Sequence, residues 1–237
     1  MIMRNLQLVR DRITSACIAA GRSPDAVGLL AVSKKFGPEA VITAINSGQR
    51  AFGENYIAEG VEKILALQAW QAAPPEKLDA PLEWHCIGPV QSNKTRLVAE
   101  HFDWVQSVDR LKIAQRLSEQ RPPHLPPLQI CLQVNVDGGA NKSGVAPAEL
   151  AELVQAVASL PRLSLRGLMT IPEPAIDFEA ACAVHTRARA LFDHINSSGL
   201  LTSPMDTLSM GMTADLEAAI HSGSTMVRVG TAIFGNR

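Results

Sequence analysis

One stretch of the sequence decides the fold class: residues 28–55 read GLLAVSKKFGPEAVITAINSGQRAFGEN. The apolar runs at 28–34 and 51–55 each have the length of a short buried strand. Between them, Pro38 has the position of a first-turn proline, and the helix that it opens is expected to end at Gly48. A strand, a helix and a second strand in this order form the basic unit of an α/β protein.

The same alternation continues along the whole chain, with eight apolar segments separated by amphipathic ones. It predicts an α/β fold, a single (β/α)8 TIM barrel domain over residues 1–237. A doubly wound open sheet shares the alternation. The strand count and the absence of Gly-x-Gly-x-x-Gly after a strand favour the barrel. The predicted strands are 28–34, 51–55, 84–88, 104–108, 129–136, 166–171, 207–211 and 226–230.

Composition and charge exclude several classes of protein. The 237 residues are 19% charged and 46% hydrophobic, which is typical of a compact globular protein. With 22 Lys+Arg and 23 Asp+Glu, the chain lacks the positive charge that sequence-independent nucleic-acid binding requires. No apolar run approaches the roughly 18 residues that cross a bilayer. The N-terminal segment interrupts its apolar pairs with polar residues, unlike a signal peptide.

The four cysteines are far apart in the sequence, and each has apolar neighbours: Cys17, Cys86, Cys131 and Cys182. Neither a Cys-x-x-Cys pair nor a His/Cys cluster with zinc-ligand spacing is present. We therefore expect free thiols in a reducing compartment, favour the cytoplasm, and predict no metal site.

In a (β/α)8 barrel the active site lies at the C-terminal ends of the strands. Polar residues in or at the ends of apolar strands are therefore the candidate functional residues, since each needs a partner or a function. The candidates are Lys34, Asn55, His85, Asn135, Ser209 and Arg228. Lys94 and Lys142 lie in predicted loops on the same mouth, where solvated turns are the simpler interpretation.

Lys34 ends the first predicted strand. Strand alternation places Leu30, Val32 and Lys34 on one face and Lys35 on the other. Among apolar neighbours at a barrel mouth, a lysine loses hydration and more of it is the free amine, which attacks carbonyl groups. A surface lysine at a strand end would give the same pattern.

The loops after the last two strands have the composition of a phosphate site. Ser209, Met210 and Gly211 end the seventh predicted strand, and Gly230 and Thr231 follow the eighth. Glycines allow backbone N–H groups to approach a phosphate, and hydroxyl groups add donors, although tight turns would also need glycines. A carbonyl-capturing lysine and a phosphate cradle in one mouth suggest pyridoxal 5'-phosphate (PLP), or a phosphorylated sugar in a class I aldolase.

Three further candidates could contact a cofactor ring. Strand periodicity points Arg228 to the same face as Gly230, and a permanent cation beside a pyridine nitrogen would keep that nitrogen unprotonated. Pairing of Arg228 with a carboxylate such as Glu54 is the alternative. Asn55 and His85 could hydrogen-bond the ring or its substituents, although an isolated histidine in a strand is commonly a satisfied core residue.

At these residues the sequence resembles the PLP homeostasis proteins, a family also called PLP-binding proteins. The matching stretches extend across the chain in the order expected of the family. They are 29–34, 52–56, 84–94, 142–144, 166–169, 208–212 and 223–235. The resemblance implies a single barrel of the alanine-racemase N-terminal type that holds PLP.

The resemblance also implies roles for individual residues. Lys34 matches the lysine that holds PLP as an aldimine, a Schiff base. Arg228 matches the arginine that faces the pyridine nitrogen, and Asn55 and His85 fall near the ring. The phosphate-binding positions are matched by Ser209, Met210, Gly211, Gly230 and Thr231. No residue is firmly assigned as catalytic.

The role that the resemblance implies is control of the free PLP pool, in vitamin B6 metabolism, with PLP-dependent apo-enzymes as expected recipients. A two-base racemase needs a second base opposite its lysine. In related racemases a tyrosine from a second domain of the partner subunit supplies it. Here the only tyrosine is Tyr56, and the sequence ends soon after the eighth strand. We therefore expect a monomer with little or no turnover; a racemase-like PLP enzyme acting on amino acids is the alternative.

Overall fold

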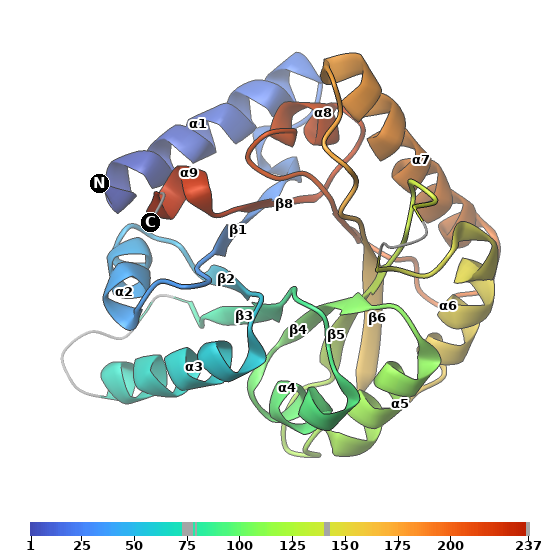
Figure 1. Ribbon diagram of the computed structural model, residues 1–237, viewed down its shortest axis with the longest axis horizontal. Coiled ribbons are helices and arrows are strands. Elements are labelled where there is room, and N and C mark those ends of the chain that lie inside the picture. The colour runs from blue at the N-terminus through green and yellow to red at the C-terminus, as the bar shows by residue number, and fades with distance from the viewer. Residues whose placement is uncertain (73–77, 79, 140–142, 236–237) are drawn as a thin grey trace.

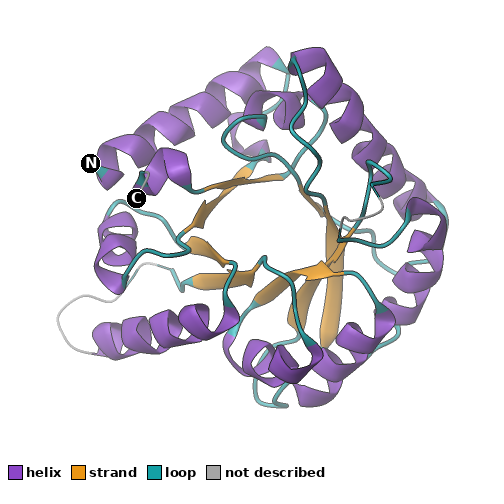
Figure 2. Ribbon diagram, in the orientation of Figure 1, coloured by secondary structure: helices purple, strands orange, loops and turns teal. Residues whose placement is uncertain are grey.

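The computed structural model describes residues 1–72, 78, 80–139 and 143–235. Within these ranges the strands form one closed parallel barrel in the order β1 to β8. Figures 1 and 2 show the strands as an inner ring surrounded by helices. The strands are β1 (Gly28–Val32), β2 (Ala51–Glu54), β3 (Glu83–Cys86), β4 (Trp104–Val108), β5 (Leu128–Gln133), β6 (Leu163–Met169), β7 (Thr207–Ser209) and β8 (Met226–Val229).

The helices follow the strands around the outside of the ring. They are α1 (Ile2–Ala19), α2 (Pro38–Asn46), α3 (Ile57–Ala72), α4 (Thr95–His101), α5 (Leu111–Gln120), α6 (Leu150–Ala158), α7 (Phe178–Ser197), α8 (Leu216–His221) and α9 (Thr231–Phe234). Short 3-10 helices are η1 (Pro24–Ala26), η2 (Ser92–Lys94) and η3 (Pro147–Glu149). The (β/α)8 barrel predicted from the alternation is confirmed.

The structure shortens several of the predicted strands. The fifth ends at Gln133 instead of residue 136 because the chain there turns toward the 143–145 segment. Val145 N donates to Gln133 O at 2.8 Å, and Asn135 N donates to Val145 O at 3.0 Å, so these groups bond each other instead of the neighbouring strand. Pro38 does open a helix, and Gly48 beyond its end has a φ of 84°, in the left-handed region that glycine tolerates.

Two apolar regions result from the alternation of side chains along each strand. The outward faces pack against the helices in the main core, which includes Ala31 of β1 and Phe52 of β2. The inward faces fill the barrel, where Leu30, Val32 and Ile87 form a separate cluster. The predicted inward position of Leu30 and Val32 is therefore confirmed.

The cysteines are free thiols, with Cys17, Cys86 and Cys131 buried and Cys182 half-buried. Burial raises the pKa of both Cys86 and Cys131 to about 12. Across the described ranges, no group of His, Cys, Asp and Glu has the arrangement of a metal site, and no helix is long and apolar enough to cross a membrane.

Gly167 tests the register between β6 and β7, where it pairs with Thr207. A Cβ atom at Gly167 would lie 1.6 Å from the Thr207 carbonyl oxygen, so the backbone would have to move. We expect Gly167→Ala to lower the free energy of unfolding by at least about 2 kcal/mol, measured by urea denaturation. The control is Gly28→Ala, whose Cβ would lie 3.8 Å from Thr225 O and should change stability by less than about 0.5 kcal/mol. Equal urea concentrations at the midpoint of unfolding for Gly167→Ala and Gly28→Ala would contradict this register.

Candidate functional site

A cavity of about 460 Å³ opens at the C-terminal ends of the strands, where active sites lie in this fold. Its walls come from residues that end or follow β1, β2, β3, β6, β7 and β8. The lining residues are Val32, Lys34, Lys35, Phe36, Asn55, Ile87, Ile171, Met212, Thr213, Ala214, Arg228, Gly230, Thr231 and Gly235.

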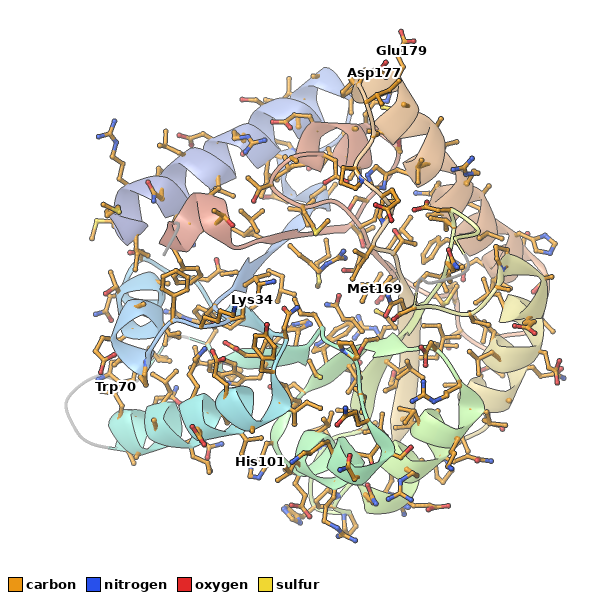
Figure 3. All side chains as sticks on the ribbon, in the orientation of Figure 1. Lys34, Trp70, His101, Met169, Asp177 and Glu179 are labelled. Atoms are coloured by element: carbon orange, nitrogen blue, oxygen red, sulfur yellow. The ribbon has the colours of Figure 1, made fainter. Side chains whose placement is uncertain are left out.

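Lys34 lies at this mouth, at the inner edge of the ring (Figure 3). Its side chain is exposed, so the loss of hydration expected from the sequence is not observed. Lys35 was expected on the opposite face, yet it also borders the cavity. The reason is its φ of 64°, which turns the chain away from the strand geometry just after β1. Lys35 Nζ lies 5.8 Å from the centre of the Tyr56 ring.

Arg228 is a buried cation at the floor of the cavity. Its Nη1 donates to both the carbonyl oxygen and Oγ of Ser209 at 2.8 Å, and its Nη2 donates to Thr170 O at 2.7 Å. Burial lowers the pKa of Arg228 to about 10, which leaves it charged at neutral pH. The alternative pairing with Glu54 is not present, because Glu54 lies outside the barrel with Lys63.

A network of polar side chains, called the interior chain below, extends from Arg228 through the barrel interior. Ser209 Oγ donates to Gln106 Oε1 at 2.6 Å, and Gln106 Nε2 lies 2.9 Å from His85 Nδ1. His85 stacks on Trp104, with ring centres 5.0 Å apart. Its burial lowers the pKa of His85, which favours a neutral ring that accepts at Nδ1. His85 Nε2 then faces the Glu83 carboxylate at 3.5 Å.

The predicted site residues fall into two groups. Those that border the cavity are Lys34, Asn55, Arg228, Gly230 and Thr231. Those that are buried and do not line it are His85, Ser209, Met210 and Gly211. The second group supports the first, since Ser209 bonds Arg228 directly and His85 connects to it through Gln106.

Two other candidates lie away from this group. The side chain of Asn135 accepts from Gly138 N and donates to Gly139 O, so it stabilises its own loop. Lys94 ends η2, half-buried, and does not line the cavity. Lys142 lies outside the described residues.

Sequence reasoning missed the apolar and loop residues that complete the walls. Phe36, Ile87 and Ile171 carry no chemical signal, although each lies at or just after a strand end. Met212, Thr213 and Ala214 follow Ser209-Met-Gly211 directly, so continuing that segment by a few residues would have found them.

These residues fit a flat heteroaromatic ring that bears an aldehyde and a phosphate. Val32 and Ile87 provide apolar surface, while Arg228 provides a cation. Asn55 Oδ1 is buried without a hydrogen-bond partner in the described part of the chain, so it has a lone pair to offer. A Cβ atom at Gly230 would lie 3.1 Å from Val32 O, so glycine allows the start of α9 to lie close to the end of β1 at the cavity wall.

Comparison with known proteins gives full-length matches. Residues 5–237 match the family model described as alanine racemase, N-terminal domain. The pyridoxal phosphate homeostasis protein of Pseudomonas aeruginosa is 56% identical over 236 residues, covering 100% of this chain and 96% of the relative. The protein of the same name from Escherichia coli K12 is 52% identical over 238 residues, covering 100% and 97%.

Solved structures agree with this match. PipY of Synechococcus elongatus, solved with PLP bound, has a TM-score of 0.83 and 32% identity, covering 99% of this chain and 100% of that one. An alanine racemase of Clostridium difficile has a TM-score of 0.72 and 15% identity, covering 99% of this chain and 57% of that one. The second similarity shows the fold alone.

The interior chain predicts coupled stability effects. Ser209→Ala or Gln106→Leu leaves a buried partner unsatisfied, so each should lower the free energy of unfolding by about 1–3 kcal/mol. Because Ser209 and Gln106 belong to one hydrogen-bond network, the double variant should lose less unfolding free energy than the sum of the two single losses. Urea denaturation should show a difference of at least about 0.5 kcal/mol. The control is Ser118→Ala, which removes a hydrogen bond to Pro161 O. Its loss of unfolding free energy should add to that of Ser209→Ala without coupling. If the losses of unfolding free energy in Ser209→Ala and Gln106→Leu were strictly additive, the two residues would not be coupled through this network.

Proposed function

The chain belongs to the alanine racemase N-terminal domain family and, within it, to the pyridoxal phosphate homeostasis proteins, and we propose that it binds PLP at the barrel mouth and contributes to PLP homeostasis. The observation that carries this proposal is the meeting of Lys34 and Arg228 in one cavity. A primary amine and a buried cation there match the two ends of an aldehyde-bearing pyridine.

Each group around the cavity has a proposed role. PLP, when bound, supplies an aldehyde that an amine can capture and a ring that withdraws electrons. Lys34 Nζ is the capturing amine. The Arg228 guanidinium, which donates to Ser209 Oγ, would face the ring nitrogen and keep it unprotonated, and the Oδ1 atom of Asn55 would accept from a ring substituent.

The phosphate is proposed to lie at the loops after β7 and β8. Gly230 and Thr231 border the cavity. The N–H groups of Ile233 and Phe234 in α9 donate to Gly230 O, so the proposed phosphate donors at the start of this helix are the N–H groups of Thr231 and Ala232. Met210 and Gly211 do not line the cavity, and we propose that they support the loop after β7. Gly211 has a φ of 96°, in the left-handed region that glycine tolerates. His85 likewise acts indirectly, through the interior chain and not by contact with the ring.

Little or no turnover is proposed. Racemisation needs a second base opposite Lys34. Among the described residues that line the cavity, the other titratable side chains are Lys35 and Arg228. Tyr56 is absent from this lining; half of its surface is exposed. For a racemase-like enzyme acting on amino acids, the second candidate, Lys35 is the second base that the described lining offers.

The remaining elements of the proposal concern partners and location. Residues 1–237 are proposed to act as one PLP-binding domain and as a monomer. PLP-dependent apo-enzymes receive the cofactor. The buried free thiols Cys17, Cys86 and Cys131 support a reducing compartment such as the cytoplasm.

Removal of the amine tests the proposed binding. Wild-type protein mixed with PLP should develop a visible-wavelength absorption band, and borohydride reduction followed by peptide mapping should locate the added mass on Lys34. Lys34→Ala should lose the band, because the proposal assigns capture of the aldehyde to the Lys34 amine, although Lys35 also borders the cavity. Lys112→Ala, on the exposed face of α5, is the matched control and should keep it. A full band in Lys34→Ala would refute the assignment.

Carrier and racemase are distinguished by chiral analysis. We expect L-alanine incubated with the PLP-loaded protein to yield no more D-alanine than free PLP does at the same concentration, because the proposed site lacks a dedicated second base. Rapid interconversion that is abolished in Lys35→Ala would instead establish the second candidate. Timed transfer of bound PLP to an apo-enzyme, compared with free PLP, then measures the carrier role itself.

A further inference from the structure

A buried ion pair lies outside the barrel, between the ends of β1 and β2 and helix α3. Lys63 Nζ is 2.6 Å from Glu54 Oε1, and the two side chains are 3% and 0% exposed. Burial raises the pKa of Glu54, and Lys63 opposes that shift. Burying two charges is costly unless their geometry and hydrogen bonds compensate, so such a pair needs a reason. Neither residue borders the cavity described above.

The pair is bonded to the end of the strand that precedes Lys34. Lys63 Nζ donates to Ser33 O at 2.9 Å, and Ser33 Oγ donates to Glu54 Oε1 at 2.6 Å. The carbonyl group of Ser33 belongs to the peptide bond immediately before Lys34. Lys63 therefore holds one of the two peptide groups that flank Lys34.

The second flanking peptide group is held by the same helix. The N–H group of Lys35, which belongs to the peptide bond after Lys34, donates to Glu59 Oε1. The same oxygen lies 3.3 Å from Lys63 Nζ. Lys35 has a φ of 64°, which is unfavourable for a residue with a side chain and persists only where its surroundings hold it. The bonds from α3 provide that restraint on both sides of Lys34.

The pair also holds the neighbouring strand. Glu54 is the last residue of β2, and Asn55 after it borders the cavity. Since side chains alternate along a strand, Ser33 and Glu54 point outward to α3 while Lys34 and Asn55 face the mouth. Helix and strand approach closely here: a Cβ atom at Gly60 would lie 3.2 Å from Glu54 Cβ. One cation thus connects the two strand ends that carry Lys34 and Asn55.

We infer that Lys63, with Glu54 and Glu59, is a positioning residue that sets where the Lys34 amine meets the aldehyde of the cofactor. It acts through the backbone on either side of Lys34 and does not touch the ligand. The inference rests on the proposed function, because it takes Lys34 as the capturing amine. It goes beyond that function by assigning a task to charged groups outside the barrel.

The experiment compares rates of capture. Purified variants are mixed with excess PLP, and the growth of the visible band is followed by stopped flow below the melting temperature of each protein. Because small misplacements of a reacting group cost large factors in rate, Lys63→Met should be slower by at least about tenfold. Capture by Glu59→Ala, which changes a half-buried residue, should be slower by at least about threefold.

Two matched controls separate positioning from general loss of stability. Arg121 is another buried cation that binds backbone carbonyl groups, those of Ala99 and Phe102, and Arg121→Met should capture PLP at the wild-type rate while folded. Glu62→Ala removes an exposed carboxylate from the same helix and should also match wild type. Equal slowing in Arg121→Met and Lys63→Met would overturn the inference.

A readout without PLP completes the test. In the apo protein, amide hydrogen exchange at Lys35, followed by NMR, should be faster in Glu59→Ala than in wild type and unchanged in Glu62→Ala. If Lys63→Met does not fold, Glu59→Ala decides alone: wild-type capture and wild-type exchange in that variant would overturn the inference. If wild-type protein forms no band at Lys34, the proposed function fails instead, and the exchange result still reports on the restraint.

Discussion

Closure of the barrel between its first and last strands is the constraint on which the site depends. Gly28 of β1 pairs with Met226 of β8, and the pairing continues to Ala31 and Val229. Lys34 follows one of these strands and Gly230 follows the other, so two ends of the sequence meet at one cavity. Figure 1 shows α1 and α9 side by side at the same junction, where Asn5 Nδ2 donates to Ile233 O at 3.0 Å. An open sheet would leave these residues apart.

The fold could be predicted from the sequence because the alternation of strand and helix patterns repeats along the chain. The depth of each residue inside the barrel could not be predicted in this way. Periodicity distinguishes the inner from the outer face of a strand, as with Leu30 and Ala31, but all inward residues share the same period. His85 and Ile87 are both inward residues near the end of β3, yet Ile87 reaches the cavity and His85 lies beneath it. The difference depends on the stagger of the strands, which no single segment of sequence records.

The charged groups behind the site were beyond sequence reasoning for a different reason. Lys63 lies in an amphipathic helix, where lysine is ordinarily exposed. Its burial depends on Ser33, which follows β1, on Glu54, which ends β2, and on Gly60, which lets the helix approach. The sequence around Glu54 does not predict the pair either. Its neighbours Gly53 and Asn55 face inward, so alternation places Glu54 on the outer face but does not identify its partner. Only the assembled packing shows that a cation and a carboxylate meet there.

The polar chain inside the barrel also has a direction. Arg228 donates to Ser209, Ser209 donates to Gln106, and the Gln106 amide donates to His85, whose remaining N–H faces Glu83. Every dipole is aligned from the mouth toward the base, with a cation at one end and a carboxylate at the other, so each link polarises the next. Because the Arg228 guanidinium can only donate, reversing Ser209 or Gln106 alone would leave two donors or two acceptors facing each other. The cation at the mouth therefore sets which atom donates at each hydrogen bond from Arg228 to His85.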